Sequence, residues 1–191
     1  MILASGNAHK VRELGEILPG IPLEPLPAGI EMPPETGETF AENALIKARA
    51  VRAATGAVVI ADDSGIEVDA LDGRPGVRSA RYAGEDATDG ENLARMLADL
   101  ERAGGDGRAR YVCVIALIDE DGREHLFEGT CEGRITDEPR GDGGFGYDPA
   151  FVPDATGPDD DRTAAELTPE EKHAISHRGA AARALARHVG V

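Results

Sequence analysis

Two adjacent carboxylates follow an apolar run and precede two small residues. The run covers residues 57–60, Asp62 and Asp63 come next, and Ser64 and Gly65 follow. An apolar run of this length predicts a buried strand, and the small residues predict that the chain turns at its end. Mg²⁺ prefers carboxylate oxygens, usually one or two that are completed by substrate phosphates. The alternative is an ordinary strand-to-turn exit, where Asp and Gly are common.

A second candidate site lies near the N-terminus. Residues 1–4 predict a short strand, and Val11, Leu14, Ile17 and Leu18 have the spacing of a helix. The small-residue loop between them ends in the basic side chain of Lys10. Backbone N–H groups at a helix start bind anions, so the segment is a candidate phosphate site, although Asn7 could simply cap the helix. The pattern of a Walker A loop is absent.

Capping residues predict two further helices, and a candidate metal ligand lies just ahead of the first. Thr39 and Glu42 predict a capping box, and Gly56 predicts the end of that helix. Glu35, just ahead of it, is either another metal ligand or a solvated loop residue. Residues 93–100 carry the apolar stripe of a third helix, which Gly104 should end.

The second half of the chain predicts a hairpin, a glycine-rich loop and two helices. Residues 110–118 and 124–130 have the pattern of paired strands, which favours a sheet with antiparallel pairing. In the segment 141–149, Phe145 lies among glycines and either offers its ring to a flat ligand or folds into the core. The acidic segment 154–162 predicts a mobile surface loop.

The last two helices carry basic residues near their first turns. Thr168, Pro169 and Glu171 predict a helix start that presents Lys172, and His177 and Arg178 lead into an alanine-rich helix. A lone His or Arg is usually solvated, but donors near helix starts can also point toward a ligand.

Length, composition and charge limit the number of domains, the location and the class of ligand. The 191 residues, 41% of them hydrophobic, fit one domain over residues 1–191 with a substantial core. No apolar stretch is long enough for a membrane span, and no signal peptide is visible, so we expect a cytoplasmic protein with Cys113 and Cys131 as free thiols. The net charge of −16 argues against a nucleic-acid surface. An anionic ligand would therefore need local cations, and the chain has lysine only at Lys10, Lys47 and Lys172.

Taken in order, these motifs resemble the inosine-triphosphate pyrophosphatase family, which hydrolyses non-canonical purine nucleoside triphosphates such as ITP, dITP and XTP to the monophosphate and pyrophosphate. Each matching segment is weak alone, but the ordered set spans nearly the whole chain and is specific. The segments are Ser5 to Lys10, Glu35 to Ala44, Ala61 to Gly65, Gly76 to Gly84, Gly144 to Pro149 and Thr163 to Gly179.

The resemblance implies a fold, a cofactor and roles for individual residues. The fold would be α/β, elongated and two-lobed, with a long mixed sheet flanked by helices and a central substrate cleft, and the protein would be a homodimer. Mg²⁺ would be bound by Glu35, Asp62 and Asp63, and Asp63 would also accept the proton of the attacking water. The implied substrate-binding residues are Ser5, Gly6, Asn7, Ala8, His9, Lys10, Ser64, Phe145, Gly146, Tyr147, Asp148, Lys172, Ser176, His177 and Arg178.

Two other functions stay open on the residues alone. One is a related pyrophosphatase of the Maf-like kind that acts on pyrimidine or modified nucleotides, which a panel of nucleoside triphosphates would distinguish. The other is a module that senses a nucleotide without hydrolysing it. Asp62 and Asp63 argue against the second, because pure anion recognition would avoid carboxylates beside phosphates.

Overall fold

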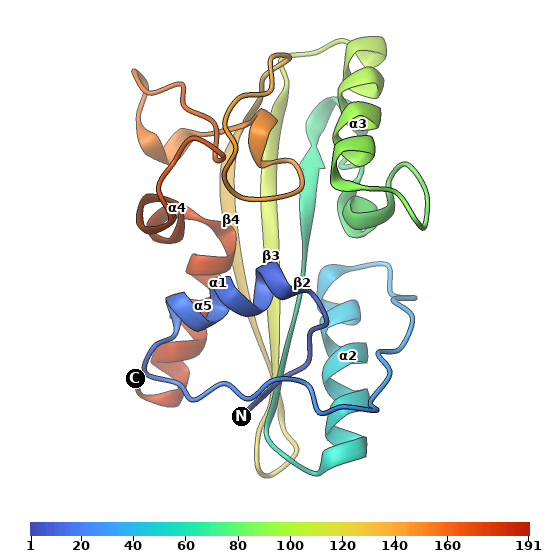
Figure 1. Cartoon of the computed structure of the whole chain (residues 1–191), viewed down its shortest axis with the longest axis vertical. Coiled ribbons are helices and arrows are strands. Elements are labelled where there is room, and N and C mark those ends of the chain that lie inside the picture. The colour runs from blue at the N-terminus through green and yellow to red at the C-terminus, as the bar shows by residue number, and fades with distance from the viewer. The chain divides into compact units, whose positions relative to one another are not determined.

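The computed structural model describes all 191 residues, and its strands form one mixed sheet. The order in the sheet is β1-β2-β3-β4-β5, and Figure 1 shows the long strands β2, β3 and β4 side by side. β1 pairs parallel with β2, and β4 pairs antiparallel with β5, which confirms the prediction of a mixed α/β sheet. The strands are β1 (Ile2–Leu3), β2 (Val59–Val68), β3 (Arg108–Ile118), β4 (Glu124–Ile135) and β5 (Phe151–Pro153).

Five α-helices accompany the sheet, and their ends follow the local signals in the sequence. Thr39 and Glu42 form the predicted capping box of α2, and Gly56 ends that helix with a φ of 67°. Thr168 and Glu171 form the same box at the start of α4. The helices are α1 (Ala8–Ile17), α2 (Phe40–Thr55), α3 (Asp89–Ala103), α4 (Pro169–Ile175) and α5 (His177–Val189). None of them is long and apolar enough to cross a membrane.

The chain divides into two compact units. The first consists of Met1–Asp63, Cys113–Gly129 and His177–Val191, and the second of Ser64–Val112 and Thr130–Ser176. Strands β2, β3 and β4 each contribute residues to both units. One domain over residues 1–191 stays a prediction.

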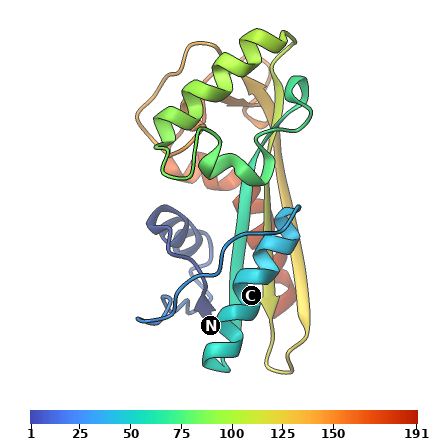
Figure 2. The same ribbon diagram turned by 90° about the vertical axis from the view of Figure 1, so that its right-hand side faces the viewer.

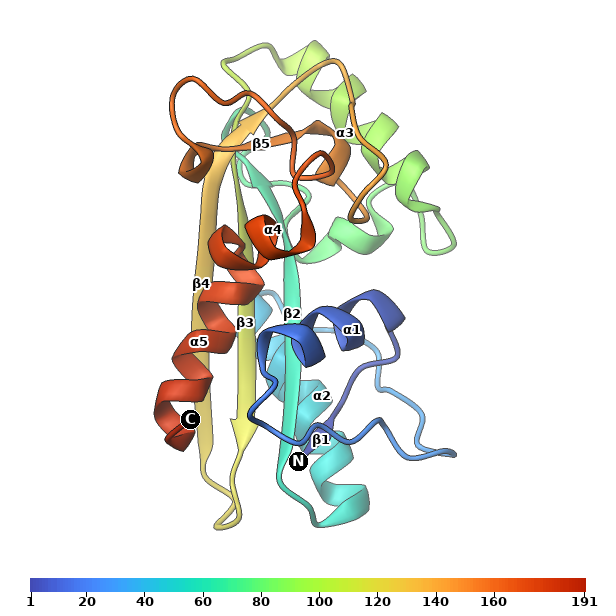
Figure 3. The ribbon, with the colours of Figure 1, turned by 60° about the vertical axis from the view of Figure 1, so that its left-hand side comes forward.

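In the first unit, the strands have an apolar side chain on each face. Ile60, Cys113 and Ile115 pack with α1 and α5, whereas Val59 and Ala61 pack with α2. The alternation arises because successive side chains of a strand point to opposite faces. In Figure 3, α1 and α5 lie on the near side of these strands. Two different helical layers therefore enclose β2.

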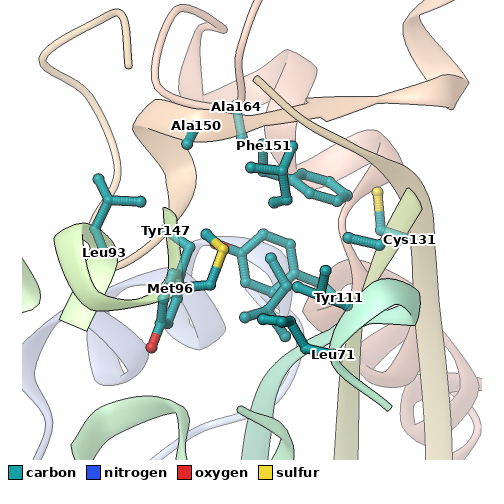
Figure 4. Packing of buried hydrophobic residues seen from close by; sticks show 13 residues of the cluster. Leu71, Leu93, Met96, Tyr111, Cys131, Tyr147, Ala150, Phe151 and Ala164 are labelled. Carbon is teal, nitrogen blue, oxygen red and sulfur yellow. The ribbon is translucent and has the colours of Figure 1, made fainter. Parts of the chain in front are cut away.

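The second unit has its own core around α3. Leu93 and Met96 of the predicted stripe pack with Tyr147 and with an edge-to-face pair formed by Tyr111 and Phe151, whose ring centroids are 4.7 Å apart (Figure 4). Aromatic pairs prefer this tilted arrangement. The stripe predicted for this helix is therefore core.

One structural prediction is wrong. Residues 61–65 do not form a turn, because β2 continues through Asp62, Asp63, Ser64 and Gly65 as far as Val68. Asp and Gly favour turns when their polar groups are satisfied locally or by water. Here both carboxylates are buried and are bound by side chains from distant helices, so tertiary contacts override the local signal.

Two other predictions are partly tested. Cys113 and Cys131 are free and buried, as predicted. The acidic segment after Pro153 lies largely at the surface, but it carries specific contacts: Asp154 pairs with Arg108 at 2.8 Å, and Asp160 pairs with Arg162 at 2.8 Å. Its mobility stays a prediction.

Candidate functional site

Asp62 and Asp63 are adjacent in sequence but face opposite sides of β2. Both are buried, with exposures of 1% and 4%. Asp62 contacts Lys10 of α1 and Arg178 of α5, whereas Asp63 contacts side chains of α2. This placement follows from the alternation of side chains along a strand. The two carboxylates therefore belong to two different polar clusters within the first unit.

The cluster around Asp63 is built on one face of α2. Lys47 Nζ donates hydrogen bonds to Asp63 Oδ1 at 3.0 Å and to Glu35 Oε1 at 2.8 Å. Asn43, one turn earlier on α2, donates from Nδ2 to Asp63 Oδ2 at 3.2 Å. The Asn43 carboxamide oxygen accepts the N–H of Gly37 at 2.8 Å, which fixes the orientation of the amide. A Cβ on Gly37 would lie 2.8 Å from this oxygen, so the contact requires glycine.

The electrostatics of this cluster favour a proton acceptor at Asp63. Burial raises the pKa of Asp63, Lys47 opposes that effect, and the negative charge of Glu35 adds to it, so that the pKa lies above its ordinary value. Burial acts to lower the pKa of Lys47, but Asp63, Asp62 and Glu35 together raise it, so Lys47 remains protonated. A carboxylate with a raised pKa takes up a proton more readily, which is the property of a general base.

The cluster around Asp62 is a buried ion network. Lys10 Nζ lies 3.1 Å from Asp62 Oδ2, and Arg178 Nη2 lies 3.3 Å from the same oxygen. Arg178, with 1% exposure, also donates from Nη1 to Glu13 Oε2 at 2.5 Å. Burial acts to raise the pKa of Asp62, but the charges of Lys10, Arg178 and Lys47 outweigh it and hold the pKa well below its usual range. Asp62 is thus the ionised counter-charge of two cations.

In the N-terminal loop, the structure confirms that Asn7 caps the first helix. Asn7 Oδ1 accepts the N–H groups of His9 at 2.9 Å and Lys10 at 3.2 Å, so Asn7 caps α1. The residues Gly6, Asn7, Ala8 and His9 are exposed, and Ser5 and Lys10 are half-buried. Phosphate binding by this segment stays a prediction.

The three predicted metal ligands do not form one cluster. Glu35 and Asp63 lie on the α2 side, where they share Lys47, and Asp62 lies on the other face. No group of three or more His, Cys, Asp or Glu side chains is arranged to hold a metal ion.

The donor chemistry nevertheless fits Mg²⁺, which needs only one or two carboxylates when phosphates complete its coordination. The ammonium group that Glu35 and Asp63 share shows that this pair can hold a cation. On the other face, the buried Asp62 Oδ1 has no hydrogen-bond partner.

In the second unit, Asp148 organises the glycine-rich loop. Its Oδ2 accepts the N–H of Phe145 at 2.8 Å and a hydrogen bond from Lys172 Nζ at 2.8 Å, while Oδ1 accepts the Tyr111 hydroxyl at 3.2 Å. Lys172 Nζ lies 5.2 Å from the centroid of the Phe145 ring, within the range of a cation–π contact. Phe145 is half-buried and does not belong to the hydrophobic core.

The other predicted residues lie in different surroundings. Tyr147 is buried in the core of the second unit, and its hydroxyl donates to the Ser79 carbonyl at 2.7 Å. Ser64 is half-buried in β2. Ser176, which ends α4, and His177, which begins α5, are both buried. A contact of these residues with substrate stays a prediction.

Three residues of the clusters had no predicted role. Lys47 and Asn43 bind Asp63, and Glu13 binds Arg178. Lys47 was visible as one of three lysines in the chain. Asn43 and Glu13 are polar residues beside the buried Ala44 and Leu14, and a polar side chain within the buried stripe of a helix is the signal that could have identified them.

Comparison with known proteins shows the family of the chain. The Ham1 family profile matches residues 1–188. The chain belongs to the Ham1 family. A dITP/XTP pyrophosphatase of Cutibacterium acnes is 50% identical over 192 residues, which cover 97% of this chain and 93% of that protein.

Solved structures of similar proteins agree with the fold. A HAM1 protein from Coxiella burnetii has a TM-score of 0.88 and 44% identity, covering 99% of this chain and 97% of that one. A nucleoside-triphosphatase / dITP/XTP pyrophosphatase from Mycobacterium abscessus has a TM-score of 0.77 and 45% identity, covering 100% and 98% of the two chains. These likenesses support the mixed α/β fold of the chain.

Proposed function

We propose that the protein is a dITP/XTP pyrophosphatase, which hydrolyses ITP, dITP and XTP to the nucleoside monophosphate and pyrophosphate and so removes non-canonical purines from the nucleotide pool. One structural observation carries the proposal: a buried carboxylate, Asp63, has a raised pKa and hydrogen bonds to Lys47 and Asn43. The relative from Cutibacterium acnes, which bears the name dITP/XTP pyrophosphatase, supports the choice of substrate.

Asp63 is the general base of the proposed reaction. A water hydrogen-bonded to this carboxylate attacks a phosphorus atom of the substrate, and Asp63 takes its proton as the new P–O bond forms and the bond to pyrophosphate breaks. Lys47 and Asn43 keep the two carboxylate oxygens in fixed positions, which avoids reorganisation during the proton transfer. The monophosphate leaves with the oxygen that the water supplied.

The phosphates require positive charge, because the chain itself carries −16. Glu35 and Asp63 would hold Mg²⁺, and Asp62 is a further proposed ligand. When bound, the ion neutralises phosphate charge and favours nucleophilic attack. Residues 5–10, with Lys10 at their end, would bind phosphate oxygens, and Lys172 would add a second ammonium group.

Recognition of the base is proposed to involve stacking and polar contacts. Phe145 to Asp148 would border the base and sugar, with the Phe145 ring against the purine. Ser64, Ser176, His177 and Arg178 would complete the contacts to phosphate and base. Donors at His177 or Arg178 would match a 6-oxo group, and an adenine would leave them unpaired at about 1–3 kcal/mol each.

The finer features of the family resemblance belong to the same proposal. They are an elongated two-lobed molecule with a central substrate cleft, a homodimer and a cytoplasmic location. Each can be measured separately from catalysis, by solution scattering, by sedimentation and by fractionation of the source cells.

Product analysis tests the proposal. We expect the protein with Mg²⁺ to convert dITP and XTP to monophosphate and pyrophosphate, with activity lost in EDTA and restored by Mg²⁺. Release of orthophosphate and a diphosphate would contradict the reaction, and full activity in EDTA would contradict the metal. A strong preference for a pyrimidine triphosphate would instead support the Maf-like alternative.

A further inference from the structure

Two consecutive backbone N–H groups of the glycine-rich loop are each bound by a carboxylate. The Phe145 N–H donates to Asp148, within the same loop. The next N–H, of Gly146, donates to Asp89 Oδ2 at 2.9 Å, although the two residues are 57 positions apart. Asp89 is the first residue of α3, and all of these residues lie in the second unit. In Figure 2, the tan loop reaches the start of α3.

Beyond these two bonds, the Asp148 N–H donates to the Phe145 carbonyl at 3.3 Å, and the Gly143 N–H donates to the Ala165 carbonyl at 3.0 Å. Neither of these bonds involves the Gly146 N–H. Gly144 and Gly146 flank Phe145 and have φ values of 69° and 64°, which other residues adopt only with strain. Glycine also gives the chain more conformational freedom than any other residue. Phe145 is only half-buried and lies outside the core, so apolar packing contributes little to its position.

Asp89 is free to bind the Gly146 N–H because other residues cap α3. Thr88 Oγ1 accepts the Glu91 N–H at 3.3 Å, and Glu91 accepts the Thr88 N–H at 2.7 Å, which completes a capping box. A carboxylate at this helix end is favoured by the helix dipole. Its hydrogen bond to the Gly146 N–H is charge-assisted and stronger than one between neutral groups.

We propose that Asp89 is a positioning residue for substrate binding: by holding the Gly146 N–H, it keeps the Phe145 ring in the orientation in which it stacks on the purine. The proposal rests on the proposed function. Asp89 acts through the loop and needs no contact with the nucleotide. The Phe145 ring is thereby held by two carboxylates, one on each of two neighbouring peptide groups.

Loss of Asp89 should weaken binding without slowing the chemical step. Without this bond, the loop must be ordered when the nucleotide binds, so the entropy of ordering opposes binding. Stacking on the base is the same in the ground state and the transition state, so KM rises while kcat is unchanged. A charge-assisted bond at an exposed site predicts a rise in KM for dITP of about fivefold.

The test compares Asp89→Ala with Asp89→Asn and with Asp86→Ala. Asn keeps a carbonyl oxygen that can accept the Gly146 N–H, so it should restore KM to within about twofold of wild type. Asp86 is exposed in the same segment, and its replacement removes the same charge without touching the loop, so KM should not change. Thermal denaturation of each variant separates a loss of stability from a loss of positioning.

A double-mutant cycle and amide exchange complete the test. In a Phe145→Ala background, Asp89→Ala should have no further effect on KM, because there is no ring left to position. Hydrogen exchange at Gly146 should accelerate in Asp89→Ala, a measurement that is independent of activity. Additive effects in the cycle, an unrescued Asp89→Asn, or unchanged exchange at Gly146 would each overturn the proposal. A wild-type protein that fails to hydrolyse dITP would instead contradict the proposed function, and the exchange experiment would still test the contact.

Discussion

Replacing Asp63 with asparagine should separate catalysis from folding. The amide cannot accept the proton of the attacking water, and general-base catalysis contributes about 10²–10⁴-fold to a rate. We therefore expect kcat for dITP to fall by at least about 100-fold, which corresponds to about 2.7 kcal/mol. Lys47 keeps its contact with Glu35 at 2.8 Å, and the amide oxygen can still accept from Lys47. The new NH₂ group then faces the NH₂ group of Asn43, whose oxygen is bound by the Gly37 N–H.

The same substitution should change stability little, because two effects oppose each other. A carboxyl whose pKa is higher in the folded than in the unfolded state binds its proton more tightly when folded, so its ionisation at neutral pH opposes folding. The neutral amide in Asp63→Asn removes that unfavourable contribution. The two NH₂ groups that face each other, those of the new Asn and of Asn43, oppose this gain. We therefore expect the Tm to stay within about 3 °C of wild type.

The assay is steady-state pyrophosphate release from dITP with Mg²⁺, together with thermal denaturation of the same samples. A variant that retains more than about a tenth of wild-type turnover, a loss below about 1.4 kcal/mol, would refute the assignment of Asp63 as the general base. A large fall in Tm would show instead that its carboxylate holds the fold together.

Three further predictions concern Asp62, Gly129 and the two cysteines. Asp62→Asn should destabilise the protein. The pKa of Asp62 is lowered on folding, so its ionised form stabilises the fold above about pH 4. Its loss removes the counter-charge beside Lys10 and leaves Arg178 with Glu13. We expect a loss of about 3 kcal/mol in urea denaturation, and a loss below 1 kcal/mol would contradict this account. Gly129→Ala would place a Cβ 2.3 Å from the His177 carbonyl oxygen, so the free energy of unfolding should fall by about 1–3 kcal/mol in urea denaturation. In the control Gly15→Ala, the new Cβ has no atom within 4 Å, so the free energy of unfolding should not fall. Burial raises the pKa of Cys113 and Cys131 to about 12. Both thiols should therefore resist a thiol reagent at pH 8 until the protein is unfolded. Rapid labelling of the native protein would contradict this prediction.

The helix ends could be predicted because their causes are local. Thr39 and Glu42 are three residues apart, and Gly56 needs only its own backbone freedom to end α2. Signals of this kind are complete within one turn of chain. The same holds for Thr168 and Glu171 at the start of α4.

The course of β2 could not be predicted because its causes are distant in sequence. The partners of Asp63 are 16 and 20 positions away, and Arg178 lies 116 positions from Asp62. A local pattern of Asp, Ser and Gly indicates a turn when those partners are unknown. Asp62 and Asp63 could be singled out from the sequence, but their division between the two faces of β2 became visible only in the structure.

The preference for non-canonical purines tests the central claim most directly. The measurement is kcat/KM of the wild-type protein for ITP, dITP and XTP, compared with that for ATP under the same Mg²⁺ concentration. The account predicts a preference of at least about 100-fold, because two or so buried donors would be mispaired by the 6-amino group of adenine. Comparable values of kcat/KM for ATP and ITP would contradict it.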